Sequence, residues 1–185
     1  MPDNVMNDAP DYEPDVWNAG WLWLDANSYS YAANDKREQN PFPQPGQKSR
    51  RTLKKLTIAE IVQNMKADGF IEAEGPVVKP GHYLVALAVD PRRDFHLMRQ
   101  DSNGRWSHKP GAREVTNKDW DGRAIVRPEK ANWGPYAQFV GYFLVPKGGL
   151  AVGRVEAKPD ATPEDAPKPR KEQERAPYLP RPQAW

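Results

Sequence analysis

One stretch of the chain predicts its fold: FHLMRQDSNGRWSH, which spans residues 95–108. Residues 95–100 and 104–108 read as two strands, and the Ser-Asn-Gly sequence between them is typical of a hairpin turn. The hairpin places His96 and His108, which are twelve positions apart, on paired strands. Because cross-strand side chains lie within reach of one another, we expect the two imidazoles to meet.

The segments around the hairpin predict helices packed on an antiparallel sheet. Residues 83–89 and 135–145 are nearly continuous apolar runs, which are typical of central strands buried on both faces. Upstream, Thr57 and Glu60 form a capping box, apolar residues follow at helical spacing, and Gly69 ends the helix. Helices that precede a run of strands indicate the α+β class.

A shorter helix is predicted from residue 28 to about residue 34, and Asp25 and Asn27 before it are both good N-cap residues. The run before it, residues 16–24, is apolar and rich in tryptophan. We expect this run to pack beneath the start of the helix.

Composition divides the 185 residues into a core and two arms. Residues 154–185 hold seven of the twenty prolines and no glycine, which favours an extended polyproline arm. Residues 1–15 carry five acidic side chains and no lysine or arginine, and they form the second arm. The core is then expected at residues 16–153. Tyr178 and Trp185 are expected to anchor the C-terminal arm to neighbouring protein subunits.

Charge and composition narrow the classes of partner. The net charge is +2; the arms carry −5 and +1, which leaves the core at +6. This is below what dedicated nucleic-acid binders show, so nucleic acid is not the favoured partner. The basic segment 48–55 fits either a solvated surface or contact with phosphates or an acidic protein. A membrane span is not predicted, because no run of about twenty apolar residues occurs. The acidic N-terminus does not fit a secretory signal.

Neither a cofactor nor a metal is expected. The chain has no cysteine, so disulfides and thiolate metal sites are excluded. Its three histidines are too few and too scattered for a zinc site, and no glycine-rich phosphate loop occurs. His82 stands at a predicted strand start and is interpreted as structural.

The candidate site consists of Ser28, His96 and His108. A hydrolase nucleophile at a helix N-terminus gains from the helix dipole, a strand imidazole serves as its base, and a third polar group fixes the tautomer of that imidazole. The three residues fit these positions, with serine where a cysteine is expected. Asp101 is a further candidate to orient His96, but its place in the turn favours a turn-capping role.

The residues around these positions resemble a known family. NSYSYA at 27–32 is similar to an Asn-Cys-Tyr-x-Tyr-Ala nucleophile motif, with Ser28 in the cysteine position. Over residues 17–146 the chain resembles the NlpC-type branch of the papain-like cysteine hydrolases, which cleaves peptidoglycan peptides and related amides. The other similar segments are the spaced histidines with their polar turn, RQD at 99–101, WSHKPG at 106–111 and GPY at 134–136.

The resemblance implies a papain-like α+β core in which Ser28, His96 and His108 take the places of nucleophile, base and orienting group. Serine is a poor substitute, because its hydroxyl is far less acidic than a thiol. We therefore expect an inactive remnant that serves as a structural or assembly component of a large particle, with its arms on neighbouring subunits. Relatives of this family occur in bacteria and phages, and extended arms suit the locking of neighbours in a phage particle. A bacteriophage virion is therefore the expected setting, and the virion or the bacterial cytoplasm the expected location.

Three alternatives stay open. One is a hydrolase of peptidoglycan peptides or similar amides that uses Ser28 with His96 and His108. Another is a binding module that keeps the cleft for recognition without cleavage. The third is an engineered Cys→Ser change at residue 28.

Overall fold

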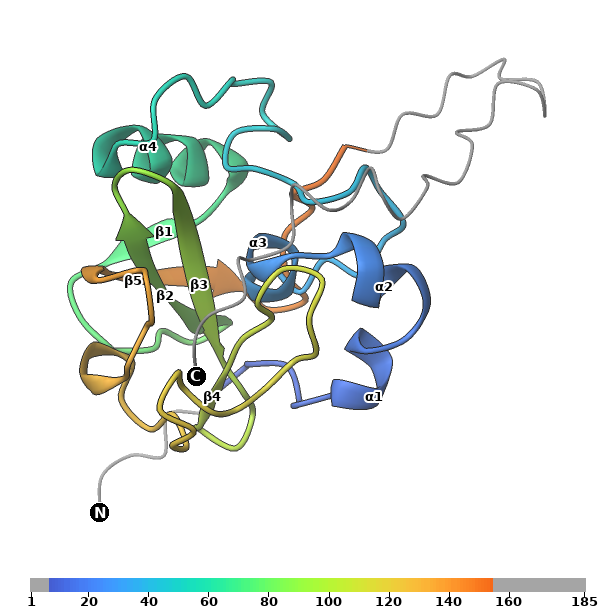
Figure 1. The fold of residues 1–185 in the computed structure, drawn as a ribbon, viewed down its shortest axis with the longest axis vertical. Helices are drawn as coiled ribbons and strands as arrows, with labels where there is room; N and C mark the ends of the chain where they lie inside the picture. Colours follow the sequence, from blue (N-terminus) through green and yellow to red (C-terminus); the bar gives the residue numbers. More distant parts are fainter. Residues whose placement is uncertain (1–6, 155–185) are drawn as a thin grey trace.

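A computed structural model describes residues 7–154 as helices packed on one antiparallel sheet (Figure 1). The sheet has five strands in the order β1-β5-β2-β3-β4, so the predicted α+β class is confirmed. A short 3-10 helix, Pro128–Lys130, precedes the last strand. The helices are α1 (Pro14–Trp17), α2 (Gly20–Asp25), α3 (Ser28–Ala32) and α4 (Ile58–Asp68), and the strands are β1 (Ile71–Ala73), β2 (His82–Asp90), β3 (Asp94–Gln100), β4 (Trp106–Ser107) and β5 (Gln138–Pro146).

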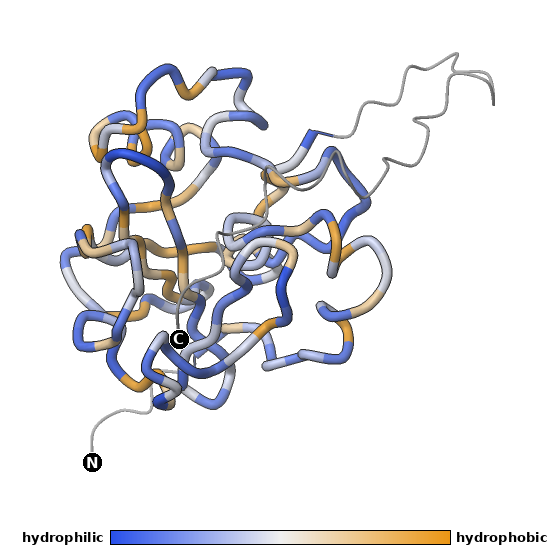
Figure 2. The backbone as a smooth tube through the Cα atoms, viewed as in Figure 1, coloured by the Kyte–Doolittle hydropathy of each residue, from blue (hydrophilic) through white to orange (hydrophobic). Residues whose placement is uncertain are grey.

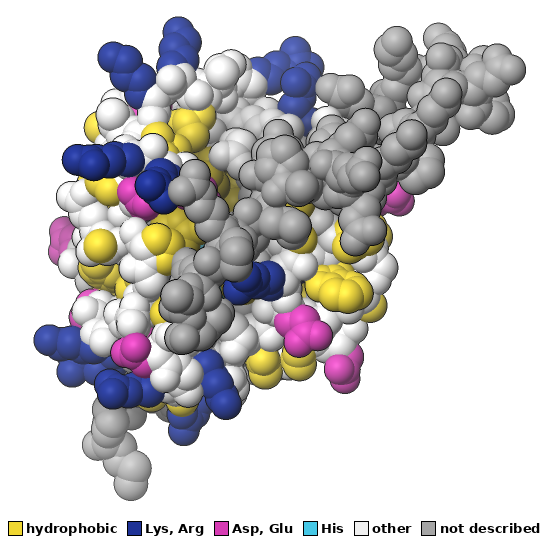
Figure 3. Space-filling model, viewed as in Figure 1, with side chains coloured by type: hydrophobic (Ala, Val, Ile, Leu, Met, Phe, Trp, Pro, Cys, Tyr) yellow, Lys and Arg dark blue, Asp and Glu magenta, His cyan; other side chains and the backbone are white. Residues whose placement is uncertain are grey.

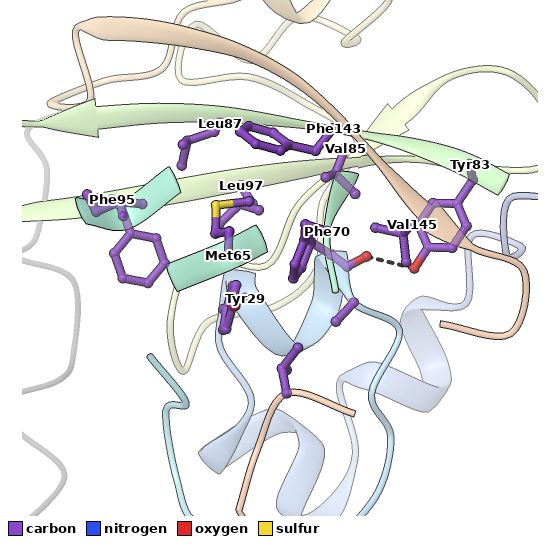
Figure 4. Close-up of a cluster of buried hydrophobic side chains, with 14 of the residues drawn as sticks. Tyr29, Met65, Phe70, Tyr83, Val85, Leu87, Phe95, Leu97, Phe143 and Val145 are labelled. Carbon is purple, nitrogen blue, oxygen red and sulfur yellow. Dashed lines mark hydrogen bonds between the residues drawn. The ribbon is translucent and has the colours of Figure 1, made fainter. Parts of the chain in front are cut away.

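β2 forms the centre of the sheet, with β3 on one side and β5 on the other. Residues 83–89 are all buried, as the continuous apolar run predicts. Successive side chains of a strand point to opposite faces, so β2 contributes to two apolar clusters. One is shared with α3 and α4 and includes Val85 and Leu87 (Figure 4). The other is shared with segment 120–136 and includes Leu84 and Ala86. Figure 2 shows these strands as an apolar centre within a largely polar chain.

α4 has the predicted ends. The Thr57 hydroxyl accepts a hydrogen bond from the Glu60 amide at 3.2 Å. Gly69 ends the helix with a φ of +112°, which is the left-handed region that favours glycine. The second half of the predicted capping box is wrong, because the Glu60 carboxylate accepts from the amides of Lys54 and Lys55 instead of reaching back to Thr57.

The hairpin around residues 101–104 is confirmed, but its second strand is shorter than predicted. β4 has only two residues and pairs with β3 at Arg99 and Gln100. In the turn, Gly104 has a φ of +81° and donates its amide proton to the Asp101 carbonyl at 2.8 Å. His108 lies just after β4, in an isolated bridge with Thr116.

The N-terminal apolar run packs as predicted only in part. Trp17 and Leu22 are buried, whereas Val16, Trp23 and Leu24 are 42%, 42% and 39% exposed. The run is apolar on all sides but forms two helices of only four and six residues, so each helix buries one side and leaves the other in solvent. α3 is also shorter than predicted and ends at Ala32.

Residues 7–15 lie along the sheet and its hairpin. The Asp8 carboxylate accepts from the Gly81 amide at 2.8 Å, and the Ser102 amide donates to the Pro10 carbonyl at 2.9 Å. Whether this segment also reaches a neighbouring subunit stays a prediction, as do the boundaries of the two arms. Tyr178 and Trp185 lie outside the described residues.

Candidate functional site

Ser28 is the first residue of α3, and the preceding residue fixes its position. The Asn27 side-chain oxygen accepts from the amides of Tyr29 and Ser30, both at 3.1 Å. The Asn27 amide group donates to the Pro43 carbonyl at 2.9 Å, which ties this N-cap to the following loop. α3 packs against β3, so Ser28 is buried beside the strand that carries His96.

The Ser28 hydroxyl contacts the backbone of β3. Its oxygen accepts a hydrogen bond from the Leu97 amide at 3.3 Å. β4 pairs with β3 only at Arg99 and Gln100, so this edge of β3 is open at Leu97. The hydroxyl therefore takes the acceptor position that a longer neighbouring strand would fill. Within residues 7–154, no hydrogen bond joins Ser28 to His96.

The two histidines meet, as the hairpin predicts. The His96 Nε2 lies 2.8 Å from the His108 Nδ1, and the His108 Nε2 lies 2.8 Å from the Lys118 carbonyl oxygen. A carbonyl only accepts, so the His108 Nε2 is the donor, and the Nδ1 of a neutral His108 must accept from His96. This order leaves the His96 Nδ1 without a proton. We call Ser28, His96 and His108 the histidine cluster.

Both imidazoles are neutral at physiological pH. Burial lowers the pKa of His108 to about 4. Burial also lowers the pKa of His96 well below its usual value, and the neighbouring His108 lowers it further. The cause is the loss of hydration, which disfavours the charged form.

Aromatic side chains cover the histidines. His96 stacks on Tyr136 at 5.0 Å between ring centroids, and His108 stacks on Trp120 at 4.8 Å. Trp133 approaches His96 edge-on at 6.1 Å. These rings come from segment 120–136, which has no regular periodicity. The sequence prediction missed them as site residues, and the only available signal was their aromatic density.

A second buried polar cluster lies next to the first, and we call it the ionic cluster. The Arg99 guanidinium is fully buried and donates to the Asp101 carboxylate at 3.1 Å and to the Tyr31 hydroxyl at 3.0 Å. Asp101 also accepts from the Ser107 hydroxyl at 2.9 Å. The suggestion that Asp101 orients His96 is therefore wrong, because its carboxylate is taken up by Arg99 and Ser107.

Lys109, directly after His108, is a further buried charge that the sequence prediction missed. Its Nζ donates to the carbonyls of Trp23 at 2.9 Å, Ala26 at 2.8 Å and Gly111 at 2.5 Å. These three acceptors match the three protons of an ammonium, while burial lowers the pKa of Lys109 to about 7. The side chain ties the strand of His108 to the turn that precedes Ser28.

Three other features of the described residues bear on the kind of site: the third histidine, the side chains of metal-binding types and the apolar character of the helices. His82 has a local role, with its Nδ1 at 2.9 Å from the Pro80 carbonyl. In the described part of the chain, no three side chains of the metal-binding types gather to hold an ion. None of the helices between residues 7 and 154 has the length and apolar character needed to cross a membrane.

The arrangement supplies a base, the His96 imidazole, but no hydroxyl that is hydrogen-bonded to it among the described residues. The His96 Nδ1 carries a lone pair, and the tautomer is set through His108 by the Lys118 carbonyl. The nearby hydroxyl of Ser28 is engaged as an acceptor by the backbone of β3. A serine nucleophile needs its proton taken by the imidazole, and no such contact is formed among the described residues.

Comparison with known proteins adds a relative. No family model matches the chain, and no solved structure matches it significantly. Insoluble matrix shell protein 1 of Ruditapes philippinarum is 37% identical over 134 residues, which cover 72% of this chain and 88% of that protein. At this identity and coverage, the chain belongs to the same family as insoluble matrix shell protein 1.

Proposed function

We propose that the protein is a non-enzymatic structural component of a many-subunit assembly, built on a hydrolase-like core that lacks its nucleophile. The observation that carries the proposal is the bonding of Ser28, whose hydroxyl accepts from the Leu97 amide and makes no hydrogen bond to His96 within the described chain. The name of the relative, an insoluble matrix shell protein, supports a structural role.

The electrostatics of the histidine cluster support the same proposal. General-base catalysis by His96 requires an imidazolium to form beside the substrate. Burial lowers the pKa of His96 well below its usual value, so that charge is disfavoured where it would be needed. A thiol gives up its proton far more readily than a serine hydroxyl, so the site suits a thiol better than the residue present.

The NlpC-type ancestry and the virion setting are the finer parts of the proposal. The placement of Ser28 at a helix start, beside a strand histidine and a second histidine, supports the ancestry. The virion setting and the cellular location stay predictions. The relative is named for an insoluble matrix. From this name we carry over to the present chain only the proposal that it is incorporated into an assembly.

Two measurements on the full chain test the proposal. Purified protein incubated with peptidoglycan is expected to release no peptide fragments, and its sedimentation at rising concentration is expected to show large oligomers. Turnover by the unmodified protein that disappears in His96→Ala would overturn the non-enzymatic part. A monomer at every concentration, with no partner retained from its source, would overturn the assembly part.

A serine hydrolase is the second candidate, and one observation favours it. The His96 Nδ1 lone pair is left free by the hydrogen-bond order through His108 and Lys118. The variant Ser28→Cys tests whether this lone pair can act on residue 28, because the chain has no other cysteine. A thiol in contact with His96 is expected to alkylate at a lower pH than the thiol of Ser30→Cys, a matched position on the same helix. Loss of this difference in Ser28→Cys/His96→Ala would assign it to the imidazole.

A further inference from the structure

The N-terminal helices expose an apolar patch in the described part of the chain. Val16 of α1 and Trp23 and Leu24 of α2 are each about two-fifths exposed, and Trp21 beside them is partly exposed. We call these four residues the α2 patch. Figure 3 shows hydrophobic side chains gathered on the face over α2, with acidic side chains close by. Contiguous exposed apolar groups that include tryptophan mark interaction sites.

Buried contacts hold the two helices of the patch in place. Trp17 and Leu22, on the inner sides of the same helices, are buried in one cluster with Tyr31. The Trp23 backbone is held by Lys109, whose Nζ donates to its carbonyl at 2.9 Å. A ligand that binds the patch therefore does not have to order the backbone beneath it, which lowers the entropic cost of association.

We infer that the α2 patch binds the C-terminal segment PYLPRPQAW, residues 177–185, of a second copy of the chain. This inference rests on the proposed assembly function and names the surface that receives the arm. The segment holds three prolines, Tyr178, Leu179 and Trp185. Proline-rich segments bind surfaces lined by aromatic rings, because their extended conformation is formed before binding.

The charge of the C-terminal arm and the length of chain that precedes residue 177 agree with this partner. Asp15 lies in the first turn of α1, next to Val16 of the patch, whereas Glu13 is paired with Lys36. Residues 168–181 carry five basic and two acidic side chains, so the arm is positive where the rim of the patch is negative. At ~3.1 Å per residue, an extended segment 155–177 spans up to ~70 Å. This length is enough to reach another copy of the chain.

Association of the full chain tests the pairing from both sides. Trp23→Ser is expected to weaken self-association by about thirtyfold, the effect of removing one interface hot spot. Tyr178→Ala/Trp185→Ala is expected to do the same without touching the core. The combination of both changes is expected to add little beyond either one. Ile71→Ser is the matched control, because Ile71 is 44% exposed on β1 at the opposite edge of the sheet.

A photo-crosslinking side chain at position 178 identifies the partner surface. Mixed isotope-labelled and unlabelled full chains are expected to give crosslinks between copies that map to residues 16–24. Crosslinks within one copy, or crosslinks to another surface in chains that still associate, would overturn the inference and leave the assembly proposal intact. Unmodified chains that stay monomeric and retain no partner from their source would overturn the assembly proposal itself.

Discussion

Two buried polar clusters lie next to each other between α3 and the β3–β4 hairpin, and they accommodate polar groups in opposite ways. In the ionic cluster, Arg99 and Asp101 keep their charges and satisfy them at 3.1 Å. In the histidine cluster, His96 and His108 stay neutral, and the His96 Nε2 donates to the His108 Nδ1 at 2.8 Å. The same helix and strands supply both clusters.

The difference shows what each cluster can do. Arg99 donates to Asp101, to Tyr31 and to the Asp11 carbonyl at 3.0 Å, so it fixes the N-terminal segment to the core and leaves no charge for chemistry. The histidine cluster retains one unprotonated nitrogen that accepts no hydrogen bond from the cluster, the Nδ1 of His96. A neutral pair is cheaper to bury than an ion, but it remains neutral only while the solution is not acidic.

The largest expected effect comes from breaking the ionic cluster. Asp101→Ala leaves the guanidinium of Arg99 buried without its counter-charge, which costs about 3–5 kcal/mol of unfolding free energy. Urea unfolding at neutral pH measures this loss. Glu74→Ala, an exposed carboxylate, is expected to change stability by about 0.5 kcal/mol or less. A loss of only that size in Asp101→Ala would mean that the charge of Arg99 does not depend on Asp101.

Acid is expected to break the histidine cluster. The pKa of His108 is about 4 in the folded chain, against 6.5 for an unperturbed histidine. The unfolded chain therefore binds more protons below pH 6.5, and stability falls as the pH falls from 6.5 toward 4. At about 1.36 kcal/mol per pKa unit, protonation of His108 is expected to lower the free energy of unfolding by on the order of 3 kcal/mol as the pH falls below 4. Burial raises the pKa of Asp101, which acts in the opposite direction.

Unfolding curves at a series of pH values measure this dependence. His82→Gln changes a partly exposed histidine outside the cluster and serves as the control. His108→Gln removes one of the two buried histidine titrations, so it is expected to make the profile less steep, whatever its effect on stability at neutral pH. An equally steep profile in His108→Gln would assign the acid sensitivity to other groups.

The sheet and its hairpin could be predicted because their signals are local. The continuous apolar run of β2 and the Gly104 turn each carry their structure in a few adjacent residues. The cover over the histidines could not be predicted in this way, because Trp120 and Tyr136 come from an irregular segment in which neither period nor turn residues fix a direction. Lys109 was missed because a lysine is almost never fully buried unless all its protons find acceptors. Two of its acceptors, the carbonyls of Trp23 and Ala26, lie far from it in the sequence, so no local pattern indicates them.

The meeting of His96 and His108 was predicted, but the bonding of Ser28 was not. The sequence predicts a return strand over residues 104–108, which would extend the pairing with β3. The observed β4 is two residues long, because the chain turns away to form the bridge of His108 with Thr116. In the observed register, Leu97 lies opposite residue 109, beyond both β4 and the predicted strand, so its amide donates to the Ser28 hydroxyl instead.

A smaller effect is expected from removing that hydroxyl. Ser28→Ala leaves the buried Leu97 amide without an acceptor, which costs about 1–3 kcal/mol. Ser28→Cys keeps a weak acceptor of similar size and is expected to cost less. Urea unfolding at neutral pH compares the two variants. Equal stability of Ser28→Ala and the unmodified protein would show that Leu97 does not need this hydroxyl, and it would remove the main support for a structural role of Ser28.

The smallest expected effect is on an ion pair with the same geometry as the buried one. Lys66 and Glu72 also meet at 3.1 Å, but their side chains are 52% and 53% exposed, against 0% and 2% for Arg99 and Asp101. Water and salt screen an exposed pair, so Glu72→Ala is expected to cost about 0.5 kcal/mol or less, and nothing measurable at high salt. Unfolding at low and high salt checks this. A cost for Glu72→Ala close to that of Asp101→Ala would mean that distance, and not burial, sets the strength of these pairs.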